Sequence, residues 1–139
     1  MADAKKLARL HRVRTLQLGL VRAEEARAHD KFASEHSLSV RIAALADAVA
    51  PTTDSAAGFS LTAAAHFRDR LHQSAQAAAS RVDAAEQFVN RATEATRAAR
   101  RDQNAVEKLI ARADADAAIA AIRAMEGAPS VVRKRHDPC

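Results

Sequence analysis

The side chains of this sequence that could bind a metal or transfer a proton include six histidines. They are His11, His29, His36, His66, His72 and His136. A metal site on a helix needs ligands three or four residues apart on one face, supported by carboxylates or cysteine. His29 and His36 are seven residues apart, and His66 and His72 are six apart. We therefore interpret the histidines as surface or seam-flanking residues and predict no metal site, since the closing His136 to Cys139 offers at most three ligands.

Other arrangements that support catalysis are missing from the sequence. There is no nucleophile elbow, and three scattered glycines cannot form a loop that cradles phosphate. Glu24 and Glu25 are adjacent, and Asp114 and Asp116 are two residues apart, which is typical of solvated helix faces. We predict a protein that is not an enzyme, with no cofactor and no small-molecule substrate.

Arginine clusters are the strongest binding signal. Together with a net charge of +5 they are compatible with nucleic-acid binding. Acidic residues are interleaved with them, however, and there is no Trp or Tyr to stack on bases. A protein partner with an acidic surface is the better interpretation, and we expect no specific nucleic acid. The clusters are Arg9, Arg12 and Arg14 in the first half of the chain, and Arg97, Arg100, Arg101, Lys108 and Arg112 in the second.

The elements that must position these residues are two long helices. From Leu61 to Ala120, steps of alternately three and four residues meet apolar side chains at all positions except Arg68, Thr96 and Gln103. Neither Gly nor Pro interrupts the chain from Phe59 to Glu126. This pattern predicts one coiled-coil helix over residues 60–126, roughly 100 Å long at 1.5 Å per residue. Because its seam is mostly Ala, we expect weak packing along it.

The first helix is predicted over residues 3–50, and its seam is less regular. One three-four track carries Leu7, Leu10, Val21, Ala28, Leu38, Ile42, Leu45 and Val49, but also Arg14, Gln17, Glu24, Lys31 and Glu35. A neighbouring track carries Val13, Leu16, Leu20 and Ala23. Gly19 lies in this apolar block, either as a tolerated flaw or to let another backbone approach closely.

The segment that separates the helices contains the only internal turn chemistry. Residues 51–59 begin with Pro51 and include Gly58, which predicts a reversal of the chain. The predicted fold is therefore all-α, with residues 1–127 forming an elongated antiparallel two-helix hairpin and residues 128–139 a basic tail. With residue 50 opposite residue 60, Leu7 would lie near Gln103, and the second helix would project beyond the first from Lys108 to Glu126.

This hairpin would gather most of the positive charge at its open end. Residues 1–27 carry a net +4 and residues 97–139 a net +3, against −2 for the remainder. The projecting segment also keeps an apolar strip without a partner in the chain. We therefore predict a partner-binding surface made of Arg9, Arg12, Arg100, Arg101, Lys108, Leu109, Arg112, Ile119 and Ile122.

Two segments resemble a known family. Residues 7–27, LARLHRVRTLQLGLVRAEEAR, and residues 102–112, DQNAVEKLIAR, resemble the opening and closing helices of the flagellar export protein FliJ and its type III secretion relatives. The resemblance implies a coiled-coil stalk, similar to those of rotary ATPases, whose open end enters a hexameric export ATPase. It also implies contacts of its body with the export gate and substrate chaperones. The basic end of the chain, RKRHDPC, departs from the family pattern.

Two other interpretations remain beside a stalk for flagellum biogenesis and motility. One is a general coiled-coil scaffold or regulatory adaptor, and the other is a weak nucleic-acid binder. The sequence shows no signal-peptide core and no apolar run near 18 residues. We therefore expect a cytoplasmic protein, associated at most peripherally with the cytoplasmic face of the inner membrane through an export apparatus.

Overall fold

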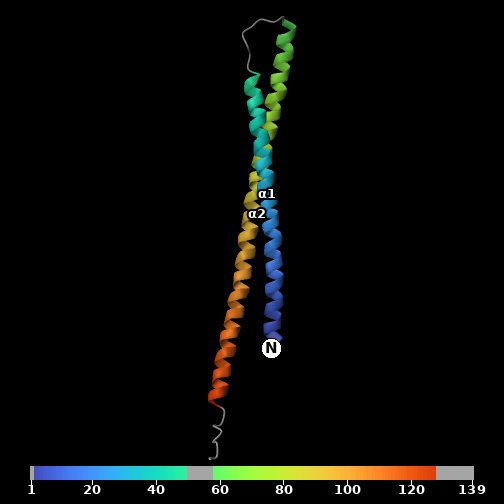
Figure 1. Ribbon diagram of the computed structural model, residues 1–139. Coiled ribbons are helices and arrows are strands. Elements are labelled where there is room, and N and C mark those ends of the chain that lie inside the picture. The colour runs from blue at the N-terminus through green and yellow to red at the C-terminus, as the bar shows by residue number, and fades with distance from the viewer. Residues whose placement is uncertain (1, 50–57, 128–139) are drawn as a thin grey trace, which may run out of the picture.

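The computed structural model of the protein describes residues 2–49 and 58–127. These form two helices, α1 (Ala2–Ala48) and α2 (Gly58–Glu126), and no strand occurs in either range. The helices run antiparallel and pack against each other as a narrow rod (Figure 1). The prediction of an all-α two-helix hairpin is confirmed. The predicted basic tail and most of the predicted turn lie outside the described residues.

The ends of the helices lie within two residues of the predicted 3–50 and 60–126. Asp3 does not cap α1 from outside; it lies in the first turn, where the positive end of the helix dipole favours its carboxylate. Ser60 similarly lies inside α2, which begins at Gly58. Arg123 in the last turn of α2 complements the opposite end of that helix dipole.

The seam of α2 follows the predicted heptad track. From Ala64 to Ala113, every position on the three-four track is buried or half-buried. Ala78, Ala85 and Val106 are the most deeply buried of them. Beyond Ala113 the track continues in sequence, but Ala117 and Ala120 are exposed. The periodicity thus predicted which face of α2 packs, although not how far the packing extends.

The seam of α1 differs from the prediction at every second position. Leu7, Val21, Ala28, Ile42 and Val49 are covered as expected, and so are Arg14 and Glu35 of the charged positions on the same track. The intervening seam residues lie one position later than predicted: they are His11, Leu18, Glu25, Phe32, Ser39 and Ala46. Leu10, Leu38 and Leu45 are exposed instead. Counting apolar residues misplaced the seam because polar side chains occupy it where α2 supplies hydrogen-bonding partners.

The core of the rod is a thin strip. Among the described residues, the buried apolar side chains are Leu18, Ala28, Ala78, Ala85 and Val106, and none of the large ones is fully enclosed. Burial of apolar surface stabilises a fold by roughly 25 cal/mol per Å², and Ala contributes little area. Pairing of α1 with α2 therefore depends on many small contacts along the length of the helices rather than on a few deeply buried side chains.

The register of the hairpin follows from pairs of residues that contact each other across the seam. His11 bonds Glu107, Arg14 bonds Asp102, and Glu35 bonds Arg81. In each pair the two residue numbers add up to 116–118. Leu7 therefore lies level with Ile110, and both line the same hollow. At the two ends α2 is left without α1 alongside, over residues 58–68 and from about Asp114 to Glu126 (Figure 1).

The predicted register was wrong by seven residues. A shift of one heptad returns the same seam positions to the interface, so the apolar pattern does not distinguish the two registers. Polar side chains do distinguish the two registers. The register predicted from the turn would place Glu25 near Glu86, which has the same charge, and His11 near Arg100. In the structure Glu25 meets Thr93 instead. Lys108, Leu109 and Arg112 consequently lie beside α1, not in the projecting segment.

Cysteine crosslinking distinguishes the two registers. In a Cys139→Ser background, Leu7→Cys with Ile110→Cys should form a disulfide under mild oxidation, since these positions share a hollow. Leu7→Cys with Gln103→Cys, the pair from the predicted register, should stay reduced because it is displaced by seven residues, about 10 Å along the helix. Non-reducing electrophoresis would report both, and the opposite result would contradict the observed register.

Gly19 lies on the solvent side of α1. A Cβ atom built on it would have no neighbour within 4 Å, so no backbone of the described chain approaches it closely. In the isolated protein Gly19 is therefore only an entropic weakness of the helix.

Gly19→Ala should stabilise the isolated protein by about 0.5–1 kcal/mol, because Ala loses less backbone freedom in a helix than Gly. Ala23→Gly, at an exposed position one turn later, should lose a similar amount. Urea unfolding followed by circular dichroism measures both free energies of unfolding. Destabilisation by Gly19→Ala would mean that something packs against this position.

Candidate functional site: the open end of the hairpin

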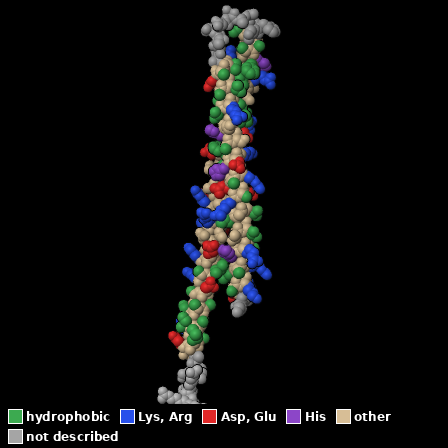
Figure 2. Space-filling model, in the orientation of Figure 1, with side chains coloured by type: hydrophobic (Ala, Val, Ile, Leu, Met, Phe, Trp, Pro, Cys, Tyr) green, Lys and Arg blue, Asp and Glu red, His purple; other side chains and the backbone are tan. Residues whose placement is uncertain are grey.

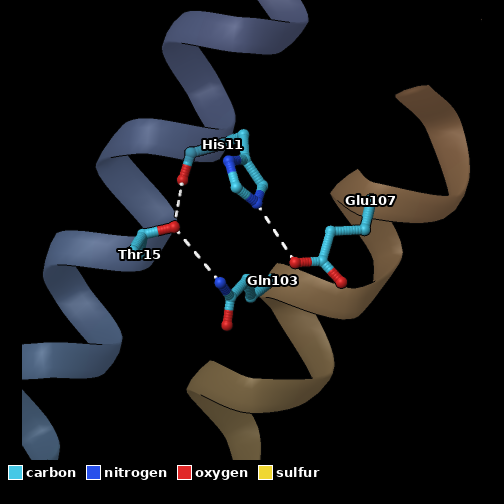
Figure 3. Close-up of polar contacts among 4 residues, drawn as sticks. All are labelled: His11, Thr15, Gln103 and Glu107. Atoms are coloured by element: carbon cyan, nitrogen blue, oxygen red, sulfur yellow. Dashed lines mark hydrogen bonds and ion pairs between the residues drawn. The ribbon is translucent and has the colours of Figure 1, made fainter. Parts of the chain in front are cut away.

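The open end of the hairpin is held by a chain of hydrogen bonds rather than by apolar contacts alone (Figure 3). His11 Nε2 lies 3.1 Å from Glu107 Oε1. One turn along, the side-chain amide of Gln103 donates to Thr15 Oγ1 at 3.2 Å, and that hydroxyl donates to the His11 carbonyl at 2.9 Å. Four side chains from two helices thus fix the register where the seam is poorest in apolar residues.

An ion pair lies beside this network. Arg14 Nη1 is 3.1 Å from Asp102 Oδ2, and the same nitrogen donates to Gln17 Oε1 at 3.0 Å. Both Arg14 and Asp102 are partly exposed. Exposed pairs contribute at most about 1 kcal/mol each. Their main effect here is to select one register among those that the heptad repeat allows.

Glu25 occupies a seam position further from the open end. Its carboxylate accepts a hydrogen bond from Thr93 Oγ1 at 2.9 Å, while Thr96 Oγ1 donates to the Val21 carbonyl at 3.4 Å. The neighbouring Thr96 and Thr93 hydroxyls, helped by the charges of His29 and Arg97, hold the pKa of Glu25 below its ordinary value, although burial opposes them. Glu25 is therefore kept ionised by its surroundings.

Three arginines surround this glutamate. Arg22, Arg97 and Arg100 line one hollow together with Glu25, Thr93 and Thr96. Arg97 pairs with Glu94 of its own helix at 2.6 Å. The hollow therefore presents guanidinium groups from both helices around a single carboxylate, which favours contact with acidic side chains of a partner.

The residues predicted to bind a partner are all exposed, as a binding surface requires. The structure does not bring them into one cluster. Arg9 and Arg12 lie on the outer face of α1, and Arg101 and Lys108 on the outer face of α2, so they point to opposite sides of the rod. Ile119 and Ile122 lie beyond the start of α1. Lys and Arg side chains accordingly project from both edges of the lower half of the rod in Figure 2.

The charge of the open end is divided between two zones. Residues 2–20 and 97–113 together carry ten basic and three acidic side chains, which gives +7. We call these two segments the basic belt. The projecting segment, residues 114–126, carries Asp114, Asp116 and Glu126 against Arg123, which gives −2. The positive charge predicted for the open end therefore lies in the basic belt, and the observed register places Lys108 and Arg112 there instead of in the projecting segment.

Several important residues were missed by the sequence analysis. Leu18, 4% exposed, was placed on neither track, and Glu25 was assigned to a solvated face although it binds across the seam. The signal that could have found them is the heptad phase of α2, which α1 must match. Once the packed face of α2 is known, only those α1 positions that face it again every seven residues can pack against it.

Three further observations bear on function. No helix in the described ranges is long and apolar enough to cross a membrane. Within those ranges no His, Cys, Asp and Glu side chains gather into a group that could hold a metal ion. The chain matches no family model, no curated protein and no solved structure.

The lowered pKa of Glu25 predicts a loss of stability in acid. Because the folded pKa lies below the unfolded one, the stabilisation is fully present above the unfolded pKa and disappears as the pH falls through the folded pKa. Glu25→Gln should remove this part of the pH dependence. Melting temperatures measured by circular dichroism across the acid range would show it, with Glu24→Gln at the exposed neighbour as the control that keeps it.

Proposed function

We propose that the protein is a non-enzymatic coiled-coil stalk of a flagellar or type III protein export apparatus. Its open end enters the ring of an export ATPase, and its body contacts the export gate or substrate chaperones. A cytoplasmic location at the inner face of the membrane follows from this role.

One observation carries the proposal. The two segments that resemble FliJ, residues 7–27 and 102–112, are far apart in sequence but meet at the open end. The bonds from His11 to Glu107 and from Arg14 to Asp102 join them directly. A stalk that enters a ring needs its recognition features at one end of a rod, and this register supplies that arrangement.

The seam also suits a part that moves inside a ring. Small side chains along α2 leave the rod narrow, and no deep apolar anchor projects from the described part of the seam. Surfaces without such anchors can slide between similar subunits, because few contacts must be broken at each step. The basic belt would then meet acidic groups of the ring, and the projecting segment would reach further into it with Ile119 and Ile122.

Removal of the projecting segment tests this role. A chain that ends at Asp114 keeps Val106, Ile110 and Ala113 on the seam and should remain helical. We expect it to lose stimulation of a cognate export ATPase, measured as turnover, and export in cells. Ile119→Ser with Ile122→Ser in the full chain should also abolish stimulation and export, and this variant keeps residues 115–139. Full stimulation by both variants would contradict entry of this end into the ring.

Charge reversal tests the basic belt separately. Arg100→Glu with Arg101→Glu should slow association with the ATPase, because complementary charge acts mainly on the rate of encounter. We expect the association rate to fall by about tenfold at low salt and the difference to shrink as salt is raised. Stopped-flow fluorescence measures the rate, with the single reversal Arg41→Glu, at an exposed site near the other end of the rod, as the control for position.

A further inference from the structure

α1 has a second apolar track that does not face α2. Val13, Leu16, Leu20 and Ala23 follow one another at three-four spacing, and all are exposed. Leu16 is 65% and Leu20 67% exposed. At 100° per residue their mean direction lies about 160° around the helix from the seam that holds α2. We call this track, with the adjoining Leu10 and Gly19, the outer strip.

Cationic side chains border the outer strip toward the start of α1. Lys5, Lys6, Arg9 and Arg12 share its side of the helix, and Lys6 and Arg9 line a hollow with Leu10 and Val13. Lys6 forms an ion pair with Asp3 at 3.6 Å. For Lys5, Arg9 and Arg12 the described part of the chain supplies no ion pair. Apolar side chains at heptad spacing beside free cations are suited to a helix with acidic residues at its flanks.

We propose that the outer strip binds a third helix, supplied by a different protein, whose own three-four apolar seam is bordered by Asp and Glu. This surface goes beyond the proposed function: its cations belong to the α1 part of the basic belt, but its apolar track is distinct from the projecting segment and from Arg100 and Arg101. It stands whether or not the open end enters an ATPase ring. Gly19 lies beside the strip with open space above it, so the added helix can approach closely there.

A second copy of this chain fits the strip less well. Antiparallel pairing of two outer strips that places Leu16 opposite Leu20 of the second copy also places Arg9 opposite Arg27 of that copy, and the symmetry repeats the repulsion. Parallel pairing sets Arg9 against itself. Like charges that face each other across a helix pair are destabilising. An acidic partner removes this conflict and neutralises the unpaired cations of the strip.

Binding of a synthetic peptide tests the proposal on the full chain. The probe is a fluorescent helical peptide about four heptads long, with Leu at its seam and Glu at its flanks. Its control carries Lys in place of Glu. We expect the acidic peptide to bind, the basic peptide not to bind, and the affinity to fall as salt rises. Equal binding of both peptides, or of neither, would overturn the proposal.

Substitutions locate the binding on the chain. Leu16→Ser with Leu20→Ser should weaken binding of the acidic peptide by at least about tenfold, as lost burial of two leucines requires. Leu38→Ser with Leu45→Ser, exposed leucines elsewhere on α1, should leave it unchanged. Circular dichroism checks that both variants keep the helical content of the wild type. Equal losses in the two variants would overturn the assignment to this strip.

Two further measurements address other occupants of the strip. Sedimentation equilibrium should show a monomer for the wild type without peptide; a dimer abolished by Leu16→Ser with Leu20→Ser would assign the strip to a second copy. Binding to vesicles of anionic phospholipid should be unaffected by the same variant. Loss of vesicle binding in that variant, without peptide binding by the wild type, would assign the strip to a membrane surface.

Discussion

The contact between the small side chains of α2 and the mixed side chains of α1 is the constraint on which the rest of the structure depends. Two helices of unequal length can bury only one narrow face each, and here the face of α2 is rich in Ala. Since each contact contributes little, α1 and α2 remain paired through the number of contacts. The consequences are a long rod, two helix ends that extend beyond their partner, and outer faces available for other proteins.

A weak apolar seam gives polar side chains an unusually large role. His11, Glu25 and Gln103 occupy positions where a stable coiled coil would carry Leu, and each finds a partner on the facing helix. Polar residues at such positions lower stability, but they specify register and orientation. This agrees with the structure, where the polar bonds choose among heptad-equivalent registers that the Ala seam cannot distinguish.

The binding surfaces of the rod follow from this division of roles. The faces of α1 and α2 that contact each other are already covered. Any partner must therefore contact the outer faces or the projecting ends of α2. The open end offers the basic belt, which includes most of the outer strip on α1, and the acidic projecting segment with its isoleucines. Their charges differ, +7 for the belt against −2 for the projecting segment, so one partner surface cannot complement both. A protein of this kind has room for several partners at one end.

The sequence by itself determined the helical class, the two helices and the packed face of α2, because heptad spacing and the positions of Gly and Pro are local properties. It also determined that Arg9, Arg12, Arg100 and Arg101 lie toward the open end, since any hairpin with a turn near residue 55 places them there. Only the tertiary structure decided the register, the phase of α1 and the extent of the projecting segment. A shift by seven residues returns the same seam positions to the interface, so the decision rests on pairs such as Arg14 with Asp102. Such pairs join residues far apart in the chain, so the periodicity of either helix alone does not encode them.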